Sequence, residues 1–125
     1  RCIPLEIPKI FESEYKLACI VWEKEPLSTR ELVLLCAQKL GWKRTTTYTQ
    51  LKRLSERGVL LVKDSIVTSL IPKKDVQLRE SREFLSRTFD NSLPSFIAAF
   101  TQNKALSKEE IAQIQRLIDA YKEET

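Results

Sequence analysis

The chain's only two glycines, Gly41 and Gly58, enclose the stretch "GWKRTTTYTQLKRLSERG". Glycine adopts left-handed backbone conformations without steric cost, and it commonly follows the last turn of a helix. We therefore expect one helix to end at Gly41 and another at Gly58. After Gly58 the pattern changes, because "VLLVKDSIVTSLIP" (Val59–Pro72) is rich in β-branched residues and contains Asp64-Ser65 as a turn candidate. This segment predicts a short β-hairpin.

Two helices are expected before Gly41. The first covers residues 12–24, ends before Pro26, and places apolar side chains at the i, i+3, i+4, i+7 spacing of one helix face. The second covers Thr29–Leu40 and begins at a capping box, with Ser28 as the cap and Glu31 reaching back to it. The apolar stripes of the two helices are Tyr15, Ala18, Cys19 and Trp22 in the first, and Leu32, Leu35, Cys36 and Leu40 in the second.

The third helix is expected at about Thr45–Arg57. Leu51 and Leu54 lie three residues apart, so they share the face that points to the core. Two helices joined by a turn, a third helix and then a hairpin form a helix-turn-helix followed by a wing. We therefore predict a mainly α fold with a small β-hairpin, in which residues 1–72 form a winged helix-turn-helix DNA-binding domain.

After Pro72 the chain returns to helix, at Asp75–Phe89, Leu93–Gln102 and Ser107–Tyr121. Their apolar stripes exceed what a small winged domain can cover, and exposed apolar stripes call for a partner. Residues 73–125 are therefore expected to form a three-helix dimerisation domain; packing against the winged domain of the same chain is the alternative. The expected dimerisation residues are Leu78, Phe84, Leu85, Phe89, Phe96, Phe100, Ile114, Leu117 and Ile118.

The positive charge of the chain is concentrated in one place. Residues 1–72 hold twelve Lys or Arg against eight Asp or Glu, whereas residues 73–125 hold nine of each. Within Gly41–Gly58 alone, five cations stand against the single acid Glu56. The whole net charge of +4 therefore resides in this stretch, as a polyanion-binding module requires.

At 100° per residue, the face opposite Leu51 and Leu54 offers hydroxyls, methyl groups and long cations. Arginine can bind guanine with two hydrogen bonds, and threonine can contact a thymine methyl or a base edge. Cations before the first helical turn favour phosphate, as the helix dipole does. A solvated charged face is the alternative, but consecutive threonines are poor helix formers and solubility gives no reason for them. Expected base-reading residues are Thr45, Thr46, Tyr48, Thr49, Lys52 and Arg53; expected phosphate-binding residues are Trp42, Lys43, Arg44 and Lys63.

No set of catalytic residues competes with this interpretation. Histidine is absent, which removes the commonest general base and metal ligand, and there is no glycine-rich phosphate loop. We expect no enzyme activity, no cofactor and no metal site. Cys2, Cys19 and Cys36 lack a CxxC spacing, which favours a reducing interior and buried thiols in the last two. No run of apolar residues is long enough to span a membrane and no secretory signal is visible, so a cytoplasmic protein without membrane insertion is expected.

The sequence resembles the BlaI/MecI/CopY family of bacterial repressors, whose best-known members control penicillinase and methicillin resistance. The N-terminal part of the resemblance lies in "SEYKLACIVWE", "PLSTREL" and "GWKRTTTYTQLKRLSERGVL". The C-terminal part lies in "SREFLSRTF", "SLPSFIAAF" and "LSKEEI". The resemblance implies a homodimer that binds a palindromic operator in double-stranded DNA and represses transcription. It also implies that Thr46, Thr49 and Arg53 face DNA, and that a membrane sensor or protease pathway inactivates the repressor.

This chain departs from the family pattern at several points. It has Thr45 where lysine is frequent and Thr47 where an apolar β-branched residue is usual, and the usual glycine-arginine and double-tyrosine pattern of the wing is missing. The resistance repressors are cleaved between asparagine and phenylalanine, where this chain has Ala99-Phe100, which leaves open whether it is switched by proteolysis. The paired CxC motif of the copper-responsive branch is absent, since no cysteine follows Cys36.

Two other functions remain possible at this stage. A winged helix can serve as a protein–protein adaptor without binding DNA, and such an adaptor would present apolar or acidic residues on the third helix. A winged helix can also bind RNA, but stacking aromatics beyond Trp42 and Tyr48 are lacking here.

Overall fold

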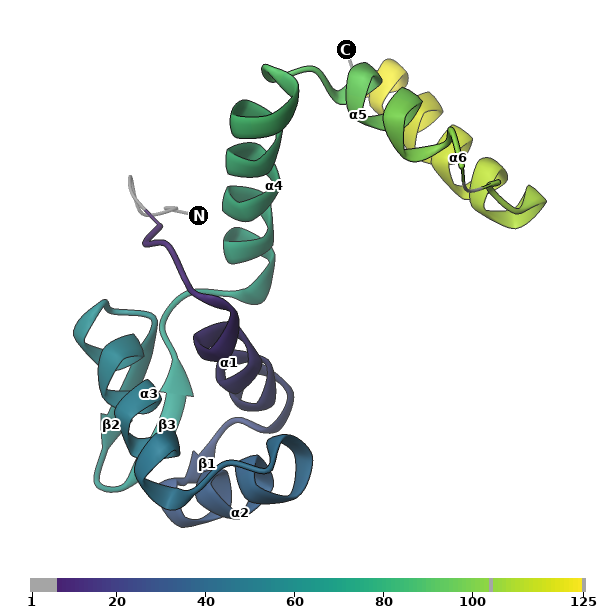
Figure 1. Cartoon of the computed structure of the whole chain (residues 1–125). Coiled ribbons are helices and arrows are strands. Elements are labelled where there is room, and N and C mark those ends of the chain that lie inside the picture. The colour runs from purple at the N-terminus through teal and green to yellow at the C-terminus, as the bar shows by residue number, and fades with distance from the viewer. Residues whose placement is uncertain (1–6, 104, 125) are drawn as a thin grey trace. The chain divides into compact units, whose positions relative to one another are not determined.

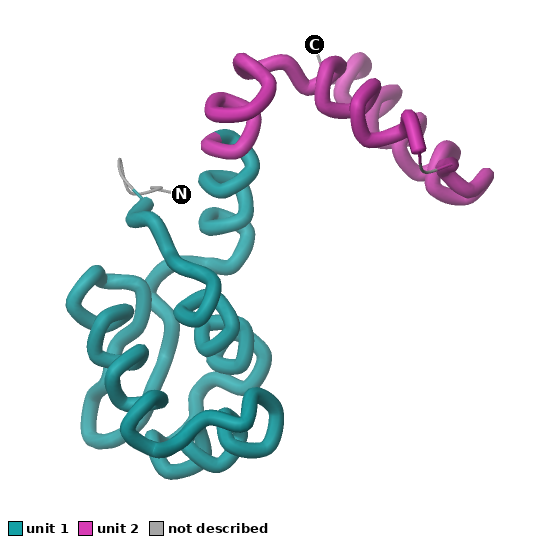
Figure 2. Tube along the Cα trace, in the orientation of Figure 1, with its two compact units in different colours: residues 1–82 teal, residues 83–125 magenta. Residues whose placement is uncertain are grey.

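The computed structural model of the protein describes residues 7–103 and 105–124. Within these residues the chain forms six helices and a three-stranded antiparallel sheet (Figure 1). It divides into two compact units, residues 1–82 and 83–125, which Figure 2 shows in different colours. The elements are α1 (Glu12–Lys24), β1 (Leu27–Ser28), α2 (Thr29–Leu40), α3 (Arg44–Glu56), β2 (Leu60–Lys63), β3 (Ile66–Ser69), α4 (Lys73–Phe89), α5 (Leu93–Phe100) and α6 (Lys108–Glu124).

Both glycines end helices as expected. Gly41 has a φ of 67° and Gly58 a φ of 78°, in the left-handed region that other residues rarely adopt. After α2, the Trp42 N–H donates to the Cys36 carbonyl at 3.3 Å; after α3, the Val59 N–H donates to the Leu54 carbonyl at 2.9 Å. These bonds satisfy carbonyls that the helix itself leaves without a donor. The glycines thus set both the start and the end of the segment that contains α3.

The hairpin is present, and its turn is Asp64-Ser65. Both residues have positive φ, 52° and 61°, as a two-residue hairpin turn requires. The sheet has the order β1-β3-β2, and β1 was not expected. Leu27 in β1 pairs with Val67 in β3, and the Thr29 N–H donates to the Ser65 carbonyl at 2.9 Å. The tip of the wing is therefore hydrogen-bonded to the first residue of α2.

The buried face of α1 is displaced by one residue from the expected stripe. Leu17, Ala18 and Val21 are fully buried. Of the expected stripe, only Ala18 is among them, whereas Tyr15, Cys19 and Trp22 are partly buried. The helical spacing of the buried residues agrees with the prediction. The centre of the buried face differs by one residue, because the charged residue Glu14 occupies a buried position that the apolar pattern does not reveal. Tyr15 and Trp22 make an edge-to-face contact at 5.8 Å.

Glu14 forms a buried ion pair that joins α1 to the end of α3. Its side chain is 0% exposed and pairs with the guanidinium of Arg57, the residue before Gly58. The same carboxylate oxygen accepts the Phe11 N–H at 3.0 Å, which caps the start of α1. The Arg57 guanidinium also donates to the Lys9 carbonyl at 3.1 Å and lies 5.3 Å from the centre of the Phe11 ring. A carboxylate buried this deeply depends on its cation, because water cannot solvate it.

The division between the units lies inside α4, whereas the sequence placed the domain boundary before it, at residues 72 and 73. Asp75 and Val76, in the first turn of α4, are buried in the first unit. The Val76 side chain extends the apolar core that α1 and α2 begin. The start of α4 therefore belongs structurally to the winged-helix unit, and the role of the second unit in dimerisation stays a prediction.

The second unit has an aromatic cluster of its own. Phe96 lies 5.8 Å from Phe84, 5.5 Å from Phe89 and 5.8 Å from Phe100, as measured between ring centres. No residue of α5 or of the described part of α6 is buried. On α6, Leu117 is 72% exposed and Ile118 49%, whereas Ile114 is partly buried. Four of the expected dimerisation residues thus contact one another within one chain, while the α6 stripe stays open.

Replacing Arg57 by methionine would keep the aliphatic stem and leave the Glu14 carboxylate buried without a cation. Removing one partner of a buried ion pair costs roughly 3–5 kcal/mol, and we expect about 3 kcal/mol here because Arg57 is 30% exposed. Urea unfolding followed by tryptophan fluorescence measures the effect, since Trp22 and Trp42 both lie in the first unit.

The matched control is Arg53→Met, because Arg53 lies in the last turn of α3, four residues before Arg57, and is exposed. It should change the free energy of unfolding by no more than about 0.5 kcal/mol. Equal losses in Arg57→Met and Arg53→Met would show that the Glu14–Arg57 pair does not stabilise the unit.

Candidate nucleic-acid interface

The two faces of α3 differ sharply in exposure. Leu51 and Leu54 are buried, as expected, together with Thr47 and Gln50. The Ser13 hydroxyl donates to the side-chain carbonyl of Gln50 at 3.4 Å, which adds a polar contact between α1 and α3. Among the residues expected to read bases, Thr46 is partly buried, and the others are exposed: Thr45, Tyr48, Thr49, Lys52 and Arg53.

The three successive threonines do not serve one purpose. Thr47 is 0% exposed, and its hydroxyl donates to the Lys43 carbonyl at 3.4 Å. It also lies beside the thiol of Cys36 on α2, where its hydroxyl lowers the pKa of that thiol against the effect of burial. Thr47 therefore packs between α2 and α3, and only Thr45 and Thr46 of the three threonines can act on the outer face of α3. One third of the threonine run is explained by packing alone.

On the outer face, two local interactions fix side-chain positions. The Thr49 hydroxyl donates to the Thr45 carbonyl at 2.9 Å, which turns its methyl group and lone pairs outward. The Arg44 guanidinium lies 5.4 Å from the centre of the Tyr48 ring, a cation–π contact along the first turn of α3. Both interactions order polar groups on the solvent side of the helix before any ligand arrives.

The cations of the interface are available for an anion. Lys43, Arg44, Lys52 and Arg53 are exposed, and no ion pair engages them among the described residues. The i, i+4 spacing of Lys52 and Glu56 would allow an ion pair, but these two side chains do not form one. Long-chain cations that keep their charge in solvent supply the sequence-independent part of nucleic-acid binding.

The start of α3 is also suited to an anion. Its N-cap residue is Lys43, which makes no side-chain capping bond, and the first turn holds no acidic residue. By contrast, Ser28 caps α2 and Ser92 caps α5. Backbone N–H groups at an uncapped helix start, together with the helix dipole, attract phosphate.

The remaining expected phosphate-binding residues lie at either end of this region. Trp42 is partly buried and packs against the core, so its indole ring mainly holds the turn before α3 against the core. Lys63 is exposed at the end of β2, next to the turn of the wing. The wing is short because its strands have only four residues each.

A cleft between α2 and α3 was not foreseen from the sequence. Its volume is about 270 Å³, and its lining residues are Arg30, Val33, Leu34, Arg44 and Tyr48. Arg30 gave no signal in the sequence because a single arginine in the first turn of a helix is common. Only the packing of α2 against α3 brings it to the same cleft as Arg44.

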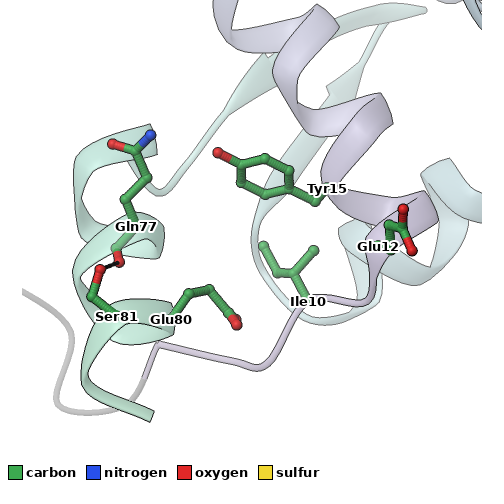
Figure 3. Close-up of a pocket in the computed structure, with 6 residues that line it drawn as sticks. All are labelled: Ile10, Glu12, Tyr15, Gln77, Glu80 and Ser81. Atoms are coloured by element: carbon green, nitrogen blue, oxygen red, sulfur yellow. Dashed lines mark hydrogen bonds between the residues drawn. The ribbon is translucent and has the colours of Figure 1, made fainter. Parts of the chain in front are cut away.

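A second, more open depression of about 670 Å³ lies between the start of α1 and α4 (Figure 3). Its two carboxylates already have partners, because Glu12 pairs with Lys16 at 3.7 Å and Glu80 with Arg79 at 3.3 Å. None of the residues expected to contact DNA lines it. This depression is therefore separate from the candidate interface.

The described residues contain no group of three or more His, Cys, Asp or Glu side chains that could hold a metal ion. Cys36 is buried and Cys19 partly buried, and both are free thiols; Cys2 lies outside the described residues. None of the helices in the described part of the chain combines the length and apolar character that crossing a membrane requires.

Comparison with known proteins identifies the family. The family model of the penicillinase repressor matches residues 10–120. The chain belongs to the penicillinase repressor family. This match spans both compact units, and the winged-helix unit followed by a helical unit is the fold that the sequence predicted. Membership in a repressor family assigns the chain to transcription regulation.

Individual members of the penicillinase repressor family are distant but match over nearly their full length. The chain is 26% identical over 121 residues to the penicillinase repressor of Bacillus licheniformis, with 94% of each chain covered. It is 22% identical over 115 residues to the methicillin resistance regulatory protein MecI of Mammaliicoccus sciuri, covering 89% of this chain and 94% of that one. It is 21% identical over 115 residues to the penicillinase repressor of Staphylococcus aureus, covering 89% and 91%.

The inward position of Thr47 has a measurable consequence for Cys36. Burial raises the pKa of the Cys36 thiol above its ordinary value, and the hydrogen bond with Thr47 acts in the opposite direction. In a variant with Cys2 and Cys19 replaced by serine, alkylation of Cys36 should therefore rise at higher pH than that of a free thiol, which titrates near about 8.5. Thr47→Val should move the profile further up.

The same variants in concentrated urea provide the control, since unfolding removes both influences. The measurement is the rate of iodoacetamide labelling against pH, with mass spectrometry as the readout. A Thr47→Val profile at or below that of the parent would contradict the contact between Thr47 and Cys36.

Proposed function

We propose that this protein is a homodimeric transcriptional repressor that binds a palindromic operator in double-stranded DNA through α3. The observation that carries the proposal is the outer face of α3, where exposed hydroxyls and unpaired cations occur together on a helix bounded by two glycines. Membership in the penicillinase repressor family supports the same function. The relatives named above are repressors of penicillinase and regulators of methicillin resistance.

In the proposed complex α3 lies in the major groove. Arg53 binds a guanine with two hydrogen bonds, and Thr49 and Thr45 contact base edges or thymine methyl groups, with Thr46 and Lys52 beside them. Lys43 contacts phosphate at the uncapped start of the helix, where the dipole adds to its charge. Phosphate contacts set the position of the helix, and base contacts select the sequence.

The second unit supplies the proposed dimer interface. Its α6 helix presents Ile111, Leu117 and Ile118 with 52%, 72% and 49% of their surface exposed. A helix that exposes an apolar stripe of this kind gains stability when the stripe is covered by a second protein surface. A symmetric dimer covers the stripe with its own copy and explains why the operator is expected to be palindromic.

Inactivation by a protease pathway would act on α5. Ala99 and Phe100 are both exposed and lie at the end of that helix, where Thr101 is the C-cap. A peptide bond in the last helical turn is more accessible than one in the middle, since helix ends fray. The bond between these two residues is therefore the proposed site of a proteolytic switch.

An adaptor that binds protein instead of DNA is less well supported. Such an adaptor would present apolar or acidic residues on the outer face of α3. Four residues there are hydroxylic or cationic and only Glu56 is acidic.

Selection of binding sites from random duplex DNA, at a stated salt concentration, tests the proposed function. A consensus with dyad symmetry is expected, with two half-sites separated by about one helical turn. Recovery of no preferred sequence would contradict sequence-specific recognition.

Arg53→Ala should weaken binding to the selected site by roughly 1–3 kcal/mol and relax the preference at one base pair, because one bidentate contact is lost. Lys43→Ala should instead weaken binding to all sequences and lower the salt dependence by about one unit. Fluorescence anisotropy on the selected site and on random duplexes measures both. An equal loss for Arg53→Ala on the two kinds of DNA would assign Arg53 to phosphate.

Two aspartate substitutions on the apolar face of α6 test the proposed dimer interface. Leu117→Asp combined with Ile118→Asp should convert the dimer to a monomer, because carboxylates cannot enter an apolar interface without a large desolvation cost. Sedimentation velocity reports the oligomeric state of the full chain. The control is Ala112→Asp, on the opposite face of α6, which should leave the dimer intact. A dimer that survives the double substitution would place the interface elsewhere.

A further inference from the structure

We propose that the cleft between α2 and α3 binds one phosphodiester of the DNA backbone together with its deoxyribose, and that Arg30 is a phosphate-binding residue. The inference rests on the proposed DNA-binding function. It adds a contact from α2, and it gives Tyr48 a different role from the base reading that the sequence predicted.

The size of the cleft limits what it can hold. At about 270 Å³ it is smaller than the roughly 300–1,000 Å³ of sites that enclose a drug-sized ligand. It is built from two helices of one unit, and its lining combines two guanidinium groups with aliphatic and aromatic walls. A small group with an anionic part and an apolar part fits this lining.

The charge of the cleft requires an anion. Arg30 is the second residue of α2 and Arg44 the first residue of α3, so both stand at the positive ends of helix dipoles. Neither takes part in an ion pair among the described residues. The nearest carboxylate along α2, that of Glu31, accepts the Ser28 N–H at 3.3 Å and the Ser28 hydroxyl at 3.2 Å. The capping bonds hold that carboxylate at the start of α2.

Tyr48 positions one of the two guanidinium groups. Its ring lies under Arg44, 5.4 Å from the guanidinium carbon to the ring centre, and only 37% of the residue is exposed. A guanidinium held over an aromatic ring has fewer orientations open to it, which favours paired N–H bonds to phosphate oxygens. Tyr48 thus acts through Arg44 rather than by reading a base.

The apolar walls identify the backbone rather than a free anion. Leu34 is 57% exposed on α2, where it lines this cleft with Arg30 and Arg44 and also a neighbouring depression with Glu31. Val33 beside it is partly buried. A deoxyribose is the apolar part of the DNA backbone and covers such a surface, whereas inorganic phosphate has nothing that contacts it. The combination of two arginines with Leu34 therefore fits a nucleotide of the backbone.

The test uses the full chain and duplex DNA of random sequence, with affinity measured by fluorescence anisotropy over a series of salt concentrations. Arg30→Ala should weaken binding equally on all sequences and lower the slope of log affinity against log salt by about one unit. Leu34→Glu, which places a carboxylate in the cleft, should weaken binding at least as much. The matched control is Arg82→Ala, an exposed arginine on α4, which should leave the slope unchanged.

Three further variants test whether the two arginines act on the same phosphate and whether the Tyr48 ring positions Arg44. Combining Arg30→Ala with Arg44→Ala should cost less than the sum of the single losses, because contacts to one phosphate are coupled. Tyr48→Phe should keep the salt slope of the parent, since the ring is retained, whereas Tyr48→Ala should lower it. All substituted residues are exposed, and circular dichroism checks that each variant is folded.

The outcomes separate the two levels of the proposal. Absence of DNA binding by the unsubstituted protein would overturn the proposed function. Normal DNA binding with an unchanged slope in Arg30→Ala would overturn the cleft alone, as would fully additive losses in the double variant. Protection of the Arg30 side-chain N–H signals by inorganic phosphate in an NMR titration, without any effect of Arg30→Ala on DNA binding, would assign the cleft to a free anion and also overturn the inference.

Discussion

The winged-helix unit depends on the ion pair between Glu14 and Arg57. The carboxylate at the start of α1 is fully buried and holds the residue that precedes Gly58, where α3 gives way to the sheet. Arg57 in turn binds the Lys9 carbonyl and stacks on Phe11, so the chain before α1 is attached to the same point. Because the penalty for burying an unpaired carboxylate is large, Glu14 can stay buried only while Arg57 is beside it, and this requirement specifies where the end of α3 lies against α1.

With its C-terminal end held in this way, α3 leaves its N-terminal end and outer face to solvent. The division follows from individual residues: Thr47 and Gln50 turn inward beside the leucines, while Thr45, Thr49 and Arg53 turn outward. On the inward side, the polar contact from Ser13 to Gln50 adds to the burial of Leu51 and Leu54, and both fit only one rotation of the helix about its axis.

Most of the fold could be predicted from the sequence, because glycines, capping boxes and the change of period act locally. α1 and α2 have the predicted bounds, and α3 differs by one residue at each end. What could not be predicted depends on contacts between distant segments. β1 has two residues and is defined by its pairing with β3, and a charged side chain at Glu14 hides the true centre of the buried face of α1. For the same reason the sequence does not distinguish Thr47, which is buried, from the two threonines before it. The position of Arg30 in one cleft with Arg44 likewise depends on the packing of α2 against α3.

The bond from the Thr49 hydroxyl to the Thr45 carbonyl restricts what Thr49 can recognise. Its single proton is already donated at 2.9 Å, so the hydroxyl oxygen has only lone pairs left for another partner. An acceptor of this kind pairs with the amino group of adenine or cytosine, and the adjoining methyl group pairs with that of thymine; guanine presents only acceptors in the major groove and is disfavoured. With Arg53 one helical turn further on and proposed to bind guanine, the proposed half-site acquires a polarity, with its guanine on the side nearer to the C-terminal end of α3.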